Sequence, residues 1–310
     1  MKKFLSLAVL FTAIFFMTGC GGEKVKSVPD KIFASIVDDA DRKVYIEKKP
    51  ERIAVTSASF LEPLHEVGGN IVGRPDSKNN TPDWAKDIPS VGQVYQIDVE
   101  KLLSCTPDLV IVNKGMNEKL LGVLEQNNIP ALVLDMKTYE DVKREVKIFS
   151  QLTENVGNGD EIIKRMDDEI KNIIDSTPKE NLRVAILHST AQGLTVQLDG
   201  SIAGNIVKMF GWKNVADGMT PLEDNPDAAP YSMETLAAQN PDIIFVTSMG
   251  NVDKIKSNME NSIAENSAWQ VIDAVKHNRM YYLPQDLFLL SPGLRYPDAV
   301  QFISNIIQAK

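Results

Sequence analysis

Histidine and cysteine, two side chains often used in metal and catalytic chemistry, are rare in this sequence. Histidine occurs at three positions, His65, His188 and His277, and only His188 lies at the end of a predicted strand. A bare metal-ion site would need about three histidines and a carboxylate brought together from several strand ends. The motifs of serine hydrolases, phosphate-binding loops, zinc peptidases and dithiol redox proteins do not occur in the sequence. The sequence therefore predicts a protein that is not an enzyme.

The composition limits the class of protein further. The chain has 310 residues, of which 43% are apolar, enough for a large buried core. Lys and Arg number 33 against 42 Asp and Glu, a formal net charge of −9. This acidic balance argues against a nucleic-acid partner, because phosphate backbones attract basic surfaces. The two cysteines, Cys20 and Cys105, are too few for a disulfide framework, and we expect Cys105 to be a small buried apolar residue.

The first residues of the chain have the pattern of an export signal. Lys2 and Lys3 precede an apolar run over residues 4–17 that contains no acidic residue. This run is shorter than the roughly 20 residues that a helix needs to cross a bilayer. We therefore expect a signal sequence and not a permanent membrane span.

The sequence MTGC at 17–20 resembles the lipobox of bacterial lipoproteins, with Met in place of the usual Leu. The resemblance implies that residues 1–19 are a cleaved signal peptide and that Cys20 carries a lipid. The lipid would hold the protein on the extracytoplasmic face of the cell membrane. Residues 20–34 would then form the anchor and a flexible tether. The alternative is an ordinary secretory signal with an incidental cysteine.

The mature part of the chain alternates between buried strands and helical patterns. Nearly continuous apolar runs rich in β-branched residues are typical of parallel strands covered on both faces. Helical periodicity between these runs indicates βαβ units and an α/β fold. The predicted strands are 52–58, 109–113, 131–135, 183–189 and 243–248.

An internal repeat divides the chain into two similar halves. Residues 99–112 align without a gap to residues 233–246, and both contain E-x-L-x(4)-P-D followed by four apolar residues. A second pair agrees in order, since 51–57 and 182–188 each place an arginine before a buried strand. The repeat predicts two related α/β lobes.

One long amphipathic helix is expected between the lobes. Apolar residues recur at helical spacing over 158–177, and Asn158 with Glu161 forms a plausible N-terminal capping pair. The predicted organisation is an N-terminal lobe at 35–157, this helix, and a C-terminal lobe at 178–310. The fold class is thus α/β, with two Rossmann-like parallel-sheet lobes joined by one rigid helix and a ligand cleft between them. Such a stiff connection favours only a small closing movement.

These features together resemble the substrate-binding lipoproteins of bacterial ABC importers for iron-siderophores, haem and cobalamin. Segments 38–55, 269–282 and 291–298 also carry the resemblance. It implies a monomeric binding protein without an intrinsic cofactor that delivers its ligand to an ABC permease dimer and its ATPase. In this family a glutamate on each lobe docks into arginine pockets of the permease, and the repeat assigns these roles to Glu100 and Glu234. A purely local role is the alternative, since a helix N-terminus favours an acid.

The segment 73–100 is similar to the haem-binding branch of Gram-positive lipoproteins. That branch ligates haem iron with a Met and a His, and the corresponding positions here are Tyr95 and Met249. Tyr oxygen and Met sulfur are both known axial ligands of haem iron. The alternative is that Tyr95 is an aromatic wall of the cleft and Met249 a soft apolar contact.

A ligand in a two-lobed α/β protein lies outside the carboxyl ends of the strands. Anionic groups of haem or of a siderophore would need cationic partners there, and the candidates are Arg295, Lys114 and Arg74. His188, at the end of its strand, is a further candidate for ligand binding. We expect haem or another iron chelate as the transported ligand. A ferric siderophore or a corrinoid is the first alternative, and a cell-surface hydrolase or adhesin-like protein is the second.

Overall fold

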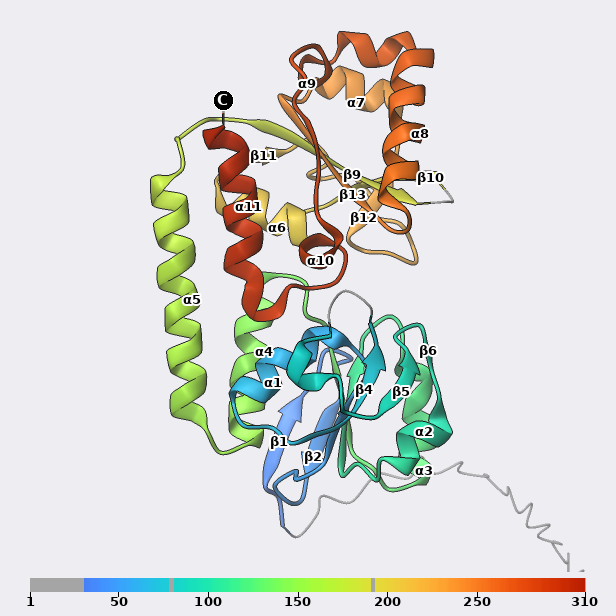
Figure 1. Cartoon of the computed structure of the whole chain (residues 1–310), viewed down its shortest axis with the longest axis vertical. Coiled ribbons are helices and arrows are strands. Elements are labelled where there is room, and N and C mark those ends of the chain that lie inside the picture. The colour runs from blue at the N-terminus through green and yellow to red at the C-terminus, as the bar shows by residue number, and fades with distance from the viewer. Residues whose placement is uncertain (1–30, 78–80, 191–192, 310) are drawn as a thin grey trace, which may run out of the picture.

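Two sheets, one in each half of the chain, organise the computed structural model (Figure 1), which describes residues 31–77, 81–190 and 193–309. We call the part built on the first sheet the first lobe and the part built on the second sheet the second lobe. The strands predicted from continuous apolar runs are confirmed as β3, β7, β8, β9 and β13, whose bounds follow below. The two lobes belong to the predicted α/β class.

The sheet of the first lobe has the order β6-β5-β4-β3-β7-β8. Its neighbouring strands run parallel except for β5 and β6, which form an antiparallel hairpin. The strands β7 and β8 are buried along nearly their whole length, as their apolar sequences require. The six strands are β3 (Ile53–Val55), β4 (Ile71–Asp76), β5 (Ser90–Gln93), β6 (Gln96–Ile97), β7 (Leu109–Asn113) and β8 (Ala131–Leu134).

The sheet of the second lobe has the order β12-β10-β9-β13-β14, and β11 pairs with the start of β9. The strands β9, β13 and β14 are parallel, whereas β10 and β12 run antiparallel to their neighbours. The bounds are β9 (Arg183–Thr190), β10 (Gly193–Gln197), β11 (Lys213–Asn214), β12 (Ala228–Pro230), β13 (Ile243–Ser248) and β14 (Met280–Tyr282). A separate hairpin of β1 (Ala34–Val37) and β2 (Lys43–Ile46) opens the described chain.

Helices cover the faces of both sheets. Those of the first half are α1 (Leu61–Glu66), α2 (Val99–Ser104), α3 (Leu121–Gln126), α4 (Tyr139–Leu152) and α5 (Val156–Ser176). Those of the second half are α6 (Ile202–Met209), α7 (Met233–Gln239), α8 (Val252–Glu265), α9 (Asp273–Lys276), α10 (Gln285–Phe288) and α11 (Tyr296–Gln308). Short 3-10 helices are η1 (Ala58–Phe60), η2 (Asp83–Ala85), η3 (Glu118–Leu120), η4 (Ser267–Val271) and η5 (Gly293–Arg295).

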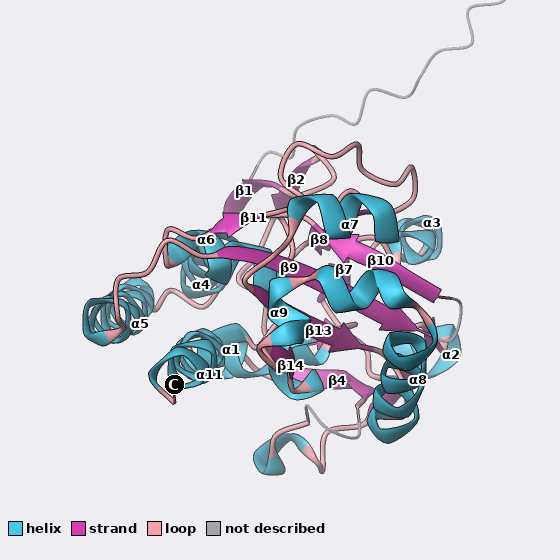
Figure 2. Ribbon diagram, turned by 90° about the horizontal axis from the view of Figure 1, so that it is seen from above, coloured by secondary structure: helices cyan, strands magenta, loops and turns pink. Residues whose placement is uncertain are grey.

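The long helix α5 follows α4 of the first lobe and precedes β9 of the second lobe. It packs against α4 and α11 through an apolar side that includes Ile162, Met166 and Ile170, and Figures 1 and 2 show the three helices together on one side of the molecule. The predicted capping pair is wrong. The helix begins at Val156, and the Asn158 amide lies inside its first turn, where it donates a hydrogen bond to Glu66 O. The chain therefore enters the helix two residues earlier than its sequence suggests.

The largest apolar cluster extends through both lobes. It contains Ile53 and Ile111 of the first sheet, Ile186 and Phe245 of the second sheet, and buried residues of α4, α5 and α11. Two smaller clusters lie on the opposite sheet faces, one under α2 and α3 and the other under α7, α8 and η4. Burial of this shared cluster contributes to the stability of both lobes.

Candidate functional site

The two lobes contact each other beside α4, α6 and α11. The backbone N–H of Tyr139 and the hydroxyl of Tyr296 both donate to Oδ1 of Asn205, at 3.1 and 2.8 Å. The Lys137 ammonium lies 2.6 Å from Asp227 of the second lobe and 3.3 Å from Asp135 of its own lobe. These contacts join residues far apart in the sequence, and they fix the side of the lobe boundary next to α5.

A second contact lies where α10 and η5 meet the first lobe. Ser59 Oγ donates to Ser291 O at 3.0 Å. Gly293 has φ +56°, and a Cβ there would lie 3.2 Å from Ser59 O and 3.5 Å from Pro63 Cγ. Glycine therefore permits both this backbone conformation and the close approach of the two lobes.

On the first lobe, Tyr95 lies in the tight turn between β5 and β6, and 67% of its surface is exposed. The buried Asn117 donates from Nδ2 to Val94 O at 2.9 Å, which ties this turn to the loop after β7. That loop exposes Met116 (47%) and the Lys114 side chain, and Asn113 Nδ2 lies 3.7 Å from the Met116 sulfur. Met116 is not among the residues predicted above, although an apolar residue in an otherwise polar loop at a strand end is a sequence signal for a ligand contact.

On the second lobe, His188 and Met249 lie near the carboxyl ends of neighbouring strands. Met249 follows β13 directly, its backbone N–H donates to Ser189 O at 3.1 Å, and its side chain is 56% exposed. His188 of β9 is partly buried, with Nδ1 2.9 Å from the Thr247 hydroxyl, and burial lowers the pKa of this imidazole. An imidazole and a thioether thus lie on adjacent strands at one edge of the sheet.

The other two histidines make local contacts. His65 lies in α1 and stacks on Trp84, with ring centroids 3.8 Å apart. His277 Nδ1 lies 2.9 Å from Asp273 O in the turn after α9. In the described ranges, no group of three or more His, Cys, Asp or Glu side chains could hold a metal ion.

The three predicted cationic residues differ in whether their charged groups already have partners within the protein. The guanidinium of Arg74 is 12% exposed and donates to the carbonyls of Ala85 (2.8 Å) and Lys86 (3.0 Å), so it holds the loop that contains η2. The guanidinium of Arg295 pairs with Asp286 and Asp298 of its own lobe. The Lys114 ammonium is exposed and has no hydrogen bond or ion pair within the described part of the chain.

The two glutamates of the repeat occupy equivalent places. Glu100 is in the first turn of α2, whose N-cap Asp98 accepts from Lys101 N, and Glu234 is in the first turn of α7, whose N-cap Ser232 accepts from Thr235 N. Both glutamates are exposed. Figure 1 shows α2 and α7 on different lobes, each away from the boundary between them.

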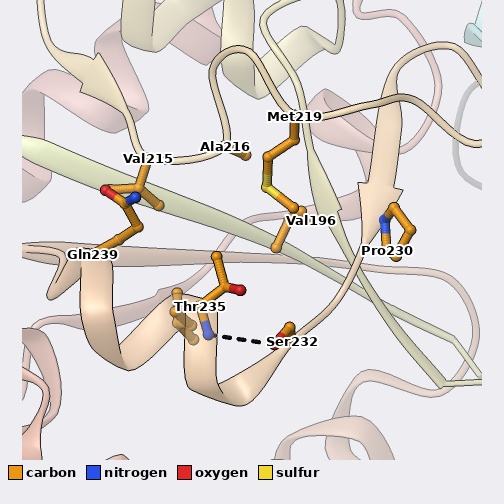
Figure 3. Close-up of a pocket in the computed structure, with 9 residues that line it drawn as sticks. Val196, Val215, Ala216, Met219, Pro230, Ser232, Thr235 and Gln239 are labelled. Atoms are coloured by element: carbon orange, nitrogen blue, oxygen red, sulfur yellow. Dashed lines mark hydrogen bonds between the residues drawn. The ribbon is translucent and has the colours of Figure 1, made fainter.

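A small pocket lies beside α7 within the second lobe (Figure 3). Its lining is mainly apolar, and it belongs to one lobe alone and not to the lobe boundary. It is lined by Val196, Val215, Ala216, Met219, Pro230, Ser232, Thr235, Leu236 and Gln239.

The predicted signal peptide and the lipidation site Cys20 lie outside the described residues. Within the described ranges, no helix has the length and apolar character that a membrane crossing requires. Phe33, in the expected tether, donates its backbone N–H to Ile46 O and so continues the β1–β2 hairpin. Cys105 is buried, and burial raises the pKa of its thiol.

Comparison with known proteins places this architecture in a family. Residues 53–287 match the family described as Periplasmic binding protein. The chain is 24% identical over 312 residues to the Fe(3+)-citrate-binding protein YfmC of Bacillus subtilis, covering 95% of this chain and 93% of that protein. It is 25% identical over 240 residues to the high-affinity heme uptake system protein IsdE of Staphylococcus aureus, covering 76% of this chain and 79% of that protein.

Solved structures share the fold. An ABC transporter substrate-binding protein from Listeria monocytogenes superposes with a TM-score of 0.75 at 23% identity, covering 85% of this chain and all (100%) of that one. The structure of S. aureus IsdE complexed with heme gives a TM-score of 0.72 at 22% identity, covering 83% of this chain and 98% of that one.

Proposed function

The chain belongs to the periplasmic binding protein family, and on this premise we propose that it is the substrate-binding protein of an ABC importer, with haem as its cargo. The names of its relatives support the transport class, since they describe binding or uptake proteins for iron citrate and haem. The proposed cargo binds in the cleft between the lobes, on the side of the boundary away from α5.

The observation that carries the proposal is the position of the exposed apolar side chains. Large apolar residues are seldom exposed without a binding role when they gather at one site. Tyr95, Met116, Met249 and Val252 are all exposed, and all follow strands at their carboxyl ends, two on each lobe. Such residues suit the flat apolar faces of a tetrapyrrole.

Iron ligation and charge are assigned to neighbouring groups. In the proposal, Tyr95 approaches the iron from the first lobe and Met249 lies on the side of the second lobe. Lys114 is available for a carboxylate of the cargo, because its ammonium is exposed near the Tyr95 turn. Arg74 and Arg295 would have to give up their present partners before they could bind an anion.

A ferric siderophore or ferric citrate is the second candidate, and the similarity to YfmC favours it. A highly anionic chelate is held by several cations, preferably arginines with forked bonds. The two arginine candidates are engaged within their own lobes. This arrangement supports haem over a strongly charged chelate, and cobalamin remains a third cargo to test.

Delivery completes the proposed function. A lipid on Cys20 holds the monomer on the extracytoplasmic face of the membrane, and Glu100 and Glu234 bind arginines of the two permease subunits. The rigid helix α5 links the lobes, so capture of the cargo involves only a small closing movement. A surface hydrolase or adhesin-like role would need none of these docking contacts.

An absorption titration tests the cargo. We expect haem to give a saturable Soret band with the purified protein and to raise its melting temperature, because a ligand bound only by the folded state stabilises it. Tyr95→Phe and Met249→Ala should change the spectrum or the affinity, whereas Tyr45→Phe in β2 should not. Ferric citrate, a ferric siderophore and cobalamin are tested in parallel. If haem gives no Soret change, it is not the cargo, and failure of all four ligands favours the role outside transport.

A further inference from the structure

The side chain of His188 lies on the face of the second sheet that looks toward the first lobe. Side chains alternate along a strand, so His188 shares a face with Ile186 of β9 and with Phe245 and Thr247 of the adjacent β13. The helices α6, α10 and α11 cover this face. Asn205 of α6 bonds to Tyr139 of the first lobe, which shows that this face points at the lobe boundary.

Along β9, coverage of this face ends at His188. Ile186 and Phe245 are fully buried, whereas His188, two residues further along β9, is partly exposed. Met249 directly follows the end of β13, two residues beyond Thr247, and is well exposed. The imidazole is therefore at the point where the sheet emerges from under its helices, beside the thioether assigned to the cargo.

Within the described residues, the hydrogen bonds around His188 engage one of its two ring nitrogens, Nδ1. The Thr247 oxygen lies 2.9 Å from His188 Nδ1 and 3.3 Å from Leu187 O. When its hydroxyl proton is donated to Leu187 O, Nδ1–H donates to the Thr247 oxygen and Nε2 keeps its lone pair. A hydrogen bond from one nitrogen that orients the ring and leaves the other to bind metal is the usual arrangement of a ligating histidine.

We propose that His188 Nε2 ligates the iron of the cargo from the second lobe and that Thr247 positions the ring for it. This inference rests on the proposed haem cargo and assigns the iron contact of the second lobe to His188, with Met249 as an apolar contact against the macrocycle. Imidazole nitrogen is the commoner haem ligand and a stronger donor to ferric iron than a thioether. Its depressed pKa agrees with this role, because a neutral ring is required for ligation.

The test uses ferric haem with the full-length protein and four variants. His188→Ala should shift the Soret band and raise the Kd on the order of a hundred-fold, and free imidazole should restore the parental spectrum. Met249→Ala should raise the Kd by about tenfold or less and leave the ligand-field spectrum unchanged. His277→Ala, which removes an exposed histidine from the same lobe, should match the parent in both measurements.

Thr247→Val separates positioning from packing. Valine keeps the shape of threonine but cannot hold the proton on Nδ1, so the Kd should rise by about tenfold while the spectrum keeps its histidine character. This variant also serves if His188→Ala fails to give a cooperative melting curve.

The outcomes distinguish the two proposals. If the parent binds haem and both His188→Ala and Thr247→Val keep its spectrum and Kd, the role of His188 is wrong and the haem cargo stands. If Met249→Ala alone alters the ligand spectrum, the thioether is the ligand and the inference is overturned. If the parent gives no Soret change with haem, both proposals fail.

Discussion

The two copies of the repeated motif build the same substructure in each lobe. In both, a short helix with an acid in its first turn ends in a left-handed residue before proline, Thr106 with φ 45° and Asn240 with φ 42°. The strand that follows, β7 or β13, lies parallel and next to the first strand in chain order of its lobe's six-stranded sheet, β3 or β9. The sequence repeat thus corresponds to a repeated helix-turn-strand unit with its neighbouring strand.

The same aspartate closes each unit. Asp108 accepts from Arg52 N at 2.9 Å and returns its own N–H to Arg52 O, and Asp242 does the same with Arg183 at 2.8 Å. The arginine side chains differ. Arg52 donates to the carbonyls of Cys105 and Thr106, whereas Arg183 donates to the Asp242 carboxylate itself as well as to Gln239 O at 3.4 Å.

Some residues of the motif therefore have a structural role, and others do not. Each aspartate satisfies backbone N–H groups at the start of a strand, and each arginine donates to the carbonyl at the end of the motif helix, Cys105 O or Gln239 O. The side-chain pair with the aspartate is found in the second lobe. Glu100 and Glu234 contribute to neither network and remain exposed in both copies. An exposed glutamate at an equivalent place in both copies, without a hydrogen bond or ion pair within the described residues, is what we expect of a docking residue.

Charge reversal at the docking positions should have the largest effect. With Glu100→Arg and Glu234→Arg together, we expect uptake of the cargo to fall on the order of a hundred-fold, because like charges would face the permease arginines. Each single reversal should reduce uptake less than the double reversal does. The two single reversals should have effects of similar size, since the two glutamates occupy equivalent places. Uptake is measured in cells that depend on this protein, and the Kd for the cargo on the purified variants.

Reversal of two acids on α5, Asp160→Arg with Glu169→Arg, is the matched control, because both are exposed and lie outside the motif. It should leave uptake unchanged. Unchanged uptake in the motif double variant would refute the docking role, and loss in only one single variant would break the equivalence of the copies.

Alanine in place of Asp242 should lower the free energy of unfolding more than alanine in place of Asp108. Asp242→Ala should lower the free energy of unfolding by about 2 kcal/mol, since it leaves a partly buried N–H and a guanidinium without their acceptor. Asp108→Ala should cost about 1 kcal/mol, because Asp108 is exposed and water can replace it. Urea unfolding measures both, and equal losses would show that the arginine partner does not matter.

The second lobe should also show a pH dependence through Asp242. Its hydrogen bond with the Arg183 side chain holds the pKa of this carboxyl below its ordinary value, against the opposing effect of partial burial. A carboxyl whose pKa is lowered in the folded state contributes stability above its unfolded pKa of about 3.9 and loses it as pH falls through the folded pKa.

The difference in unfolding free energy between the parent and Asp242→Asn should therefore be constant above about pH 5 and decrease below about pH 4. Arg183→Gln should remove most of this dependence, because it removes the main cause of the lowered pKa. A difference that stays constant down to about pH 2 would contradict the assignment.

The sequence identified the strands that bury both faces and missed those that do not. Runs such as 109–113 and 243–248 are apolar throughout, so periodicity alone indicates them. The strands β10 and β12 carry Thr, Gln and Pro. β10 gains its place by pairing with β9, and β12 by pairing with β10, which local sequence does not encode.

The candidate site was predictable only in its strand-end positions. His188 and Met249 follow from locating the strands, and Tyr95 follows from the resemblance of segment 73–100. The contacts on the side of the lobe boundary next to α5 could not be predicted. Asn205 accepts hydrogen bonds from Tyr139 and Tyr296, and these three residues lie in three separate helices. The hydrogen bonds from Arg74 to backbone carbonyls could not be predicted from the sequence either, because an arginine at a strand end is equally consistent with a ligand contact.

The smallest effect concerns the left-handed residue of each copy. Asparagine tolerates this conformation, while the β-branched side chain of threonine is strained there. Thr106→Asn should therefore raise the free energy of unfolding by about 0.5 to 1 kcal/mol, bringing the first copy closer to the second. Thr235→Asn in α7, where the backbone is helical, is the matched control and should give no gain. Equal effects in urea unfolding would show that the first copy carries no backbone strain at Thr106, and the two turns would then be energetically equivalent despite their different residues.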